Sequence, residues 1–287
     1  MTAKEEQRIE NDSKAREDTK IVDRAESECS SSSAEEGKTI DVDFEFLSMA
    51  EVDFHGIKTL LKQMMSTDIE KVDISGLADF LISQPFIGSV VKCDGLLDPY
   101  AIMTAIDCSQ ECPSIQQLLA YLSKKAAGAK EVMERFDRLL RNSKVAILLN
   151  ERLINMPADI APPLLKSLIE EIDWATEDKL LPQFEYFVFI TKVYQETISQ
   201  VDDESEQVQS KKKVKRDEIT YFFQQEDEIV EKYAIPQLTF NYKLPNQQSE
   251  DSRNAFSEYG IDPSRRVLIL ARDALPKLLN ELQKAFE

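Results

Sequence analysis

The sequence predicts an α/β domain in which a mixed sheet is flanked by helices. Segments with the alternating or continuous apolar patterns of strands interleave along the chain with segments of helical period. Of the 287 residues, 42% are hydrophobic, which is enough for a sizeable core. Strands and helices that interleave in this way are typical of an α/β fold.

The strands are predicted from two patterns. Residues 40–46 alternate apolar and acidic side chains, which predicts a half-buried strand. Residues 145–149 are continuously apolar, as in a central strand that is covered on both faces. Turn signals after residue 93 separate two short apolar runs and predict a β-hairpin. Its strands are expected at 86–91 and 100–106, a long strand at 184–194, and shorter strands at 238–242 and 267–270.

The helices are predicted from apolar stripes with a spacing of three and four residues. Ser75 is expected to cap the helix at 77–82, and Asp273 is expected to cap the helix at 275–286. A further helix buries the apolar residues of 164–172, and prolines are tolerated in its first turn. Other helices are expected at 57–64, 115–122 and 132–140, and a loop is expected at 150–157.

The chain is predicted to consist of a tail, residues 1–39, and a single folded domain, residues 40–287. The tail has no aromatic residue and is dense in charged residues and serine, so we expect it to be acidic and disordered. Ser32 and Ser33 stand three residues before Glu35 and Glu36. Acid-directed kinases accept this spacing, so both serines are predicted phosphorylation sites.

The net charge of −18 favours cationic partners. Such a charge repels the phosphates of nucleic acids and of anionic lipids, so direct binding to either is not expected. The alternative is that the charge serves solubility alone. The first residues are charged, and no apolar run approaches the roughly 18 residues of a membrane span, so we expect a soluble intracellular protein. Its four cysteines are then expected to be reduced: Cys29, Cys93, Cys108 and Cys112.

Residues suited to catalysis are scarce. His55 is the single histidine, and one histidine cannot make a cluster of metal ligands. No G-x-S-x-G motif accompanies it, so a surface or capping role is expected rather than a catalytic one. Cys108 and Cys112 have tolerable spacing for half a zinc site, but no second pair completes four ligands. We expect buried thiols near a strand end.

Phosphate-binding loops need glycine, because a Cβ would keep the backbone amides away from the anion. The chain has seven glycines, and none lies between Gly128 and Gly260. This excludes the G-x-G-x-x-G and P-loop motifs from the central strand, loop and helix. No nucleotide or coenzyme is expected as a cofactor.

One dense basic cluster lies in a loop expected near 201–218. It consists of Lys211, Lys212, Lys213, Lys215 and Arg216. Such a run is typical either of a nuclear import signal or of a solvated charged patch. We favour the import signal, because a transport receptor can reach an exposed loop.

Four segments together resemble the BCCIP family and its fungal BCP branch. They are DVDFEF at 41–46, DFHGIKTLL at 53–61, IGSVVK at 87–92 and LLNERLINMP at 148–157. The resemblance runs from about residue 40 to the end of the chain. It implies a fold similar to that of the GNAT acetyltransferases, without acetyltransferase activity, in which residues 150–157 replace the glycine-rich coenzyme-binding loop.

The same resemblance implies a protein of the nucleus and cytoplasm that acts as a chaperone for a large-subunit ribosomal protein. It also implies a role in the nuclear export of a phosphoinositide kinase. The leading hypothesis is therefore a non-enzymatic carrier of a basic protein partner. The alternatives are an acyl-CoA-dependent acetyltransferase with a divergent loop, and an adaptor in the cell cycle or DNA repair.

Overall fold

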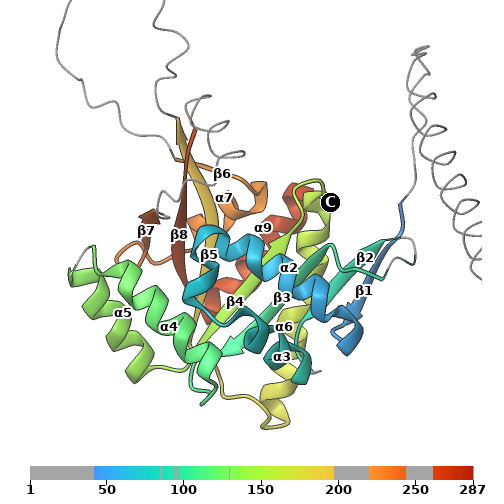
Figure 1. The fold of residues 1–287 in the computed structure, drawn as a ribbon, viewed down its shortest axis with the longest axis horizontal. Helices are drawn as coiled ribbons and strands as arrows, with labels where there is room; N and C mark the ends of the chain where they lie inside the picture. The colour runs from blue at the N-terminus through green and yellow to red at the C-terminus, as the bar shows by residue number, and fades with distance from the viewer. Residues whose placement is uncertain are drawn as a thin grey trace, which may run out of the picture. The chain divides into compact units, whose positions relative to one another are not determined.

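One sheet organises the residues that the computed structural model describes (Figure 1). These are residues 42–196, 220–243 and 261–286, apart from Pro85, Asp94, Leu96 and Ala129. Their helices and strands belong to one compact unit, Asp43–Glu287. The predicted tail at 1–39, with Ser32 and Ser33, and the predicted basic loop at 201–218 lie outside the described residues.

The sheet runs in the order β1-β2-β3-β4-β5-β8-β7, and β6 pairs with β5. Neighbouring strands are antiparallel except β4 and β5, which are parallel. The mixed α/β class is therefore confirmed, with a sheet that is mostly antiparallel. The strands are β1 (Phe44–Ser48), β2 (Ser89–Cys93), β3 (Ala101–Asp107), β4 (Val145–Arg152), β5 (Tyr186–Glu196), β6 (Thr220–Phe222), β7 (Phe240–Lys243) and β8 (Ile261–Ala271).

Helices cover both faces of the sheet. β4 shows the two sides most clearly, because Ile147 and Leu149 belong to one apolar core whereas Ala146 and Leu148 belong to the other. The first core includes α2 (Phe54–Met65), α3 (Ile74–Ser83), α4 (Pro113–Ala126) and α5 (Lys130–Asn142). The second includes α6 (Ala161–Glu177), α7 (Gln225–Lys232) and α9 (Leu275–Phe286).

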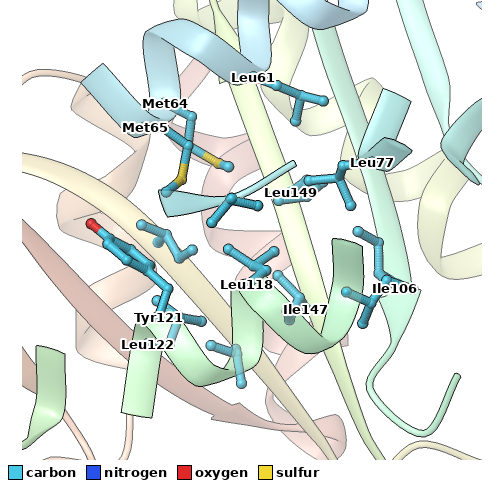
Figure 2. Packing of buried hydrophobic residues seen from close by; sticks show 14 of the residues in the cluster. Leu61, Met64, Met65, Leu77, Ile106, Leu118, Tyr121, Leu122, Ile147 and Leu149 are labelled. Carbon is cyan, nitrogen blue, oxygen red and sulfur yellow. The ribbon is translucent and has the colours of Figure 1, made fainter. Parts of the chain in front are cut away.

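The first core joins segments that are far apart in the chain (Figure 2). Leu61 and Leu77, from α2 and α3, point toward Leu149 of β4, and Leu118 of α4 approaches Ile147. All are almost inaccessible to solvent. Burial of a leucine or isoleucine of this kind contributes about 1.5–3 kcal/mol to the free energy of unfolding. The helices α2, α4 and α5 confirm those expected at 57–64, 115–122 and 132–140.

β1 differs from the half-buried strand expected at 40–46. It begins at Phe44, which is partly buried, and the side chains of Glu45, Phe46 and Leu47 are exposed. Among the described residues β1 pairs with β2 alone, at the edge of the sheet. Alternation predicted the strand correctly, but it cannot tell whether another layer covers the strand.

Other differences concern the ends of elements. Ser75 lies inside α3, and the helix is capped by Asp73, whose carboxylate accepts a hydrogen bond of 3.0 Å from the Gly76 amide. Asp273 lies in the 3₁₀ turn Arg272–Ala274 that leads into α9, and does not stand at an N-cap next to Leu275. The expected hairpin of β2 and β3 is confirmed. None of the helices in the described part of the chain is long and apolar enough to cross a membrane.

Candidate functional site

The parallel strands β4 and β5 part after four paired positions. Val145–Leu148 pairs with Tyr186–Phe189. Beyond this point β4 continues along β3, and β5 continues along β8. Side chains rather than backbone hydrogen bonds therefore connect the diverging ends, which we call the β4–β5 junction.

On the α2 side of the junction, Glu151 of β4 forms an ion pair with Lys192 of β5. Glu151 is 1% exposed and also accepts a hydrogen bond of 2.6 Å from Nε2 of Gln63. The same amide nitrogen donates to the Arg152 carbonyl at 2.8 Å. Burial lowers the pKa of Lys192, and the Glu151 carboxylate opposes this effect. The pair ties α2, β4 and β5 together.

On the opposite side, Arg152 forms a bidentate ion pair with Glu226 at the start of α7. Its Nε and Nη2 atoms donate to the two carboxylate oxygens at 2.9 and 2.8 Å. Its Nη1 atom donates to the Met156 carbonyl. Both charged side chains are buried. This guanidinium holds α7 and the chain after β4 in fixed positions.

Asp227 lies beside this ion pair and is also buried. It accepts a hydrogen bond from the hydroxyl of Thr191, while its Oδ1 atom has no hydrogen-bond partner among the described residues. Burial raises the pKa of Asp227 well above its ordinary value, and the neighbouring Glu226 raises it further. Glu151 and Glu226 each accept a hydrogen bond from a basic side chain, whereas the hydrogen-bond donor to Asp227 among the described residues is the neutral hydroxyl of Thr191.

Little space remains at the junction. The second core contains a cavity of about 20 Å³ next to Glu226 and Asn150. Its other walls are apolar side chains of β3, β4, β5, β8, α6, α7 and α9, including Met103, Leu148 and Phe189. A space of this size holds about one water molecule. No adenine nucleotide or pantetheine arm fits there.

The helix after the junction is poorly suited to bind an anion. A helix N-terminus binds phosphate through its free amides, but Pro162 and Pro163 occupy the first turn of α6 and have no N–H group. The Ala161 amide already donates to the Ala158 carbonyl. In the preceding turn, the amides of Leu153 and Met156 donate to the carbonyls of Tyr100 and Leu153.

The expected loop at 150–157 is therefore only partly correct. Asn150, Glu151 and Arg152 continue β4 and pair with β3. The sequence predicts a loop for these three residues because polar and charged side chains of this kind are mostly exposed in proteins. Glu226 and Asp227 were not identified from the sequence, because a polar and acidic run such as Gln224–Glu228 resembles a solvated surface segment.

The other residues considered for chemistry do not form a site. His55 is exposed in the first turn of α2 and forms a T-shaped contact with the Phe54 ring, so the expected surface position is confirmed. Cys108 is buried after β3, where burial raises its pKa to about 12. For Cys112, burial raises the pKa, but hydrogen bonds with Ser114 and Ile115 outweigh it and lower the pKa. Among the described residues, no three histidine, cysteine, aspartate or glutamate side chains lie close enough together to hold a metal ion.

The fold and the junction define a mixed α/β protein in which buried ion pairs close the point where the parallel strands separate. The BCCIP family model matches residues 39–230. The curated relatives include Protein BCP1 of Gibberella zeae, 36% identical over 86% of this chain and 88% of its own length. Protein bcp1 of Schizosaccharomyces pombe is 35% identical over 86% of this chain and 90% of its own length.

The chain therefore belongs to the BCCIP family. The crystal structure of BCP1 from Saccharomyces cerevisiae has a similar fold, with a TM-score of 0.58 and 24% sequence identity. The match covers 85% of this chain and 89% of that one. None of the names of this family and these relatives states an enzyme activity.

Proposed function

We propose that this protein is a non-enzymatic binding protein that escorts a basic protein partner, such as a large-subunit ribosomal protein, between nucleus and cytoplasm. The observation that carries the non-enzymatic part is the closed β4–β5 junction. Glu151, Lys192, Arg152 and Glu226 fill it with paired charges. In an acetyltransferase of the GNAT fold, a coenzyme would enter where two such strands diverge.

The class of partner follows from charge. At a net charge of −18 the chain attracts cationic surfaces from a distance. A ribosomal protein outside the ribosome carries a cationic surface that adheres to any polyanion, and carboxylates that cover this surface suppress the adhesion. An apolar contact at the centre of the interface then supplies affinity that salt does not screen.

Movement between compartments rests on the basic run Lys211, Lys212, Lys213, Lys215 and Arg216, which we propose is recognised by nuclear transport receptors. Replacing all five with neutral residues should shift the protein toward the cytoplasm of living cells. An unchanged nuclear signal would show that the run is a solvated patch. By family resemblance, a phosphoinositide kinase is a second candidate partner for export.

Co-expression tests the proposal directly. Each of a panel of large-subunit ribosomal proteins is expressed with and without this chain, and the soluble fraction is separated by gel filtration. We expect at least one basic protein to become soluble and to elute with this chain as a complex. If none becomes more soluble, the acidity serves only the solubility of the chain itself.

A second assay addresses the alternative acetyltransferase function. Coenzyme A and acetyl-CoA are titrated into the purified protein while the melting temperature is followed. A ligand that binds the folded state raises the melting temperature. We expect no change, because Pro162 and Pro163 have no N–H group for a pyrophosphate and the Ala161 amide is already hydrogen-bonded. A saturable increase would favour the acetyltransferase.

A further inference from the structure

The C-terminal half of α6 presents the single tryptophan of the chain to solvent. The helix buries Leu165, Leu168 and Ile172 in the second core. Trp174 lies away from this buried face and is 53% exposed, and Leu180, just after the helix, is 51% exposed. A large aromatic side chain in solvent has not released the free energy that its burial would supply.

Carboxylates surround this tryptophan. Glu170 stands four residues before it, and Glu177 and Asp178 stand three and four residues after it, so all lie on one side of the helix. All are exposed, and none forms an ion pair with another described residue. We call Glu170, Trp174, Glu177, Asp178 and Leu180 the Trp174 surface.

The stability of the helix does not explain these charges. The C-terminus of an α-helix carries a partial negative charge, so basic residues are favoured there and acidic ones are unfavourable. The last turn of α6 contains no basic residue, and Glu177 and Asp178 end the helix. Lys179 follows in the left-handed conformation, with φ of 61°. Glu177 and Asp178 thus lie where they weaken the isolated fold and where a cationic partner would relieve their repulsion.

We propose that the Trp174 surface binds an arginine- or lysine-rich segment of the partner, which rests on the proposed function above. A guanidinium group of the segment stacks on the indole of Trp174. The carboxylates of Glu170, Glu177 and Asp178 accept hydrogen bonds from the neighbouring basic side chains of the same segment. Leu180, which follows α6 and is 51% exposed, offers a second apolar side chain to the same segment. Tryptophan and arginine are both enriched among the few residues that supply most of the binding energy of protein interfaces.

Trp174 itself reports binding, since its emission is the only tryptophan emission of the protein. A fluorescein-labelled peptide of alternating arginine and serine is titrated into the full-length protein, with a glutamine-for-arginine peptide as the control. We expect the arginine peptide to change the emission of Trp174 and the control peptide to leave it unchanged. No change up to millimolar arginine peptide would overturn the proposal.

Variants then locate the contact by peptide anisotropy. W174A and the triple variant E170Q/E177Q/D178N should each raise the Kd about tenfold or more. The matched controls are I154A, another exposed apolar side chain, and E70Q/D79N/E111Q, which removes three exposed carboxylates elsewhere. Controls should change the Kd less than about twofold. Equal effects of both triple variants would mean binding by net charge only and would contradict the proposal.

The same variants separate this proposal from the proposed function. If a ribosomal protein is made soluble equally well by the wild type, W174A and E170Q/E177Q/D178N, the protein is a carrier but binds through another surface. If no basic protein is made soluble by the wild type, the proposed function itself fails.

Discussion

Carboxylates have opposite roles in two regions of this protein. At the β4–β5 junction, Glu151 and Glu226 are buried and paired with Lys192 and Arg152, and they close the sheet. Toward the end of α6, Glu170, Glu177 and Asp178 are exposed and have no ion-pair partner among the described residues. Desolvation explains the contrast: a buried charge needs a partner in the same molecule, whereas an exposed charge remains available to another one.

The largest effect is expected at Arg152. R152M leaves the Glu226 carboxylate buried without its cation, so the free energy of unfolding should fall by about 3–5 kcal/mol in urea denaturation. The double variant R152M/E226M removes both charges and should recover much of this loss. The exposed counterpart E170Q should change stability by less than about 0.5 kcal/mol. Equal stability of R152M and E170Q would contradict the contrast between the two regions.

The next effect depends on pH and concerns Asp227. Its pKa is raised in the folded protein by burial and by Glu226. A carboxyl group of this kind stabilises the fold fully below its unfolded pKa of about 4, and this stabilisation is lost as the pH rises toward the folded pKa. D227N cannot ionise and can still accept the hydrogen bond from Thr191.

Urea denaturation at a series of pH values checks this expectation. Relative to the wild type, D227N should gain stability steadily as the pH rises from about 4. A difference between the two proteins that does not vary with pH would mean that Asp227 ionises as easily when folded as when unfolded.

A smaller effect is expected at Lys179. The amides of Lys179 and Leu180 donate to the carbonyls of Thr176 and Ala175, the hydrogen-bond pattern of a Schellman motif, in which the left-handed residue is usually glycine. K179G should therefore raise the free energy of unfolding by up to about 1 kcal/mol, seen as a higher melting temperature. A lower melting temperature would show that the lysine side chain stabilises the helix end.

The smallest effect is expected for E177Q/D178N. Removing two negative charges from the negative end of α6 should stabilise the isolated protein by about 0.3–1 kcal/mol at low salt. The same substitutions should weaken the binding of a basic partner. A gain in stability together with a loss of affinity would distinguish carboxylates kept for binding from carboxylates kept for the fold. Loss of both would place them in the fold.

The local sequence pattern is sufficient to predict a strand or helix where a run of apolar residues determines its burial. The strand at 145–149 was predicted because its apolar side chains leave no solvated face. The next residues, Glu151 and Arg152, were assigned to a loop because their partners Lys192 and Glu226 lie far along the chain. α7 and β6 have no clear signal in the sequence, since Ile229 and Val230 are the buried apolar residues of α7, and the residues of β6 are only partly buried.

The candidate site was harder to predict than the fold for the same reason. The scarcity of glycine points to the segment after the central strand as unusual, but the ion pairs there depend on tertiary contacts that the sequence does not show. Trp174 carries no signal of exposure in the sequence, because tryptophan at a helical position is usually part of the core.

The salt dependence of a purified complex tests the central claim most directly. The Kd between this chain and a basic partner obtained by co-expression is measured by calorimetry from low to high salt. We expect the affinity to fall steeply as screening shortens the range of the charges to about 8 Å at physiological ionic strength, and then to level off. An affinity that does not vary with salt, or a complex that disappears entirely at moderate salt, would contradict a specific acidic carrier.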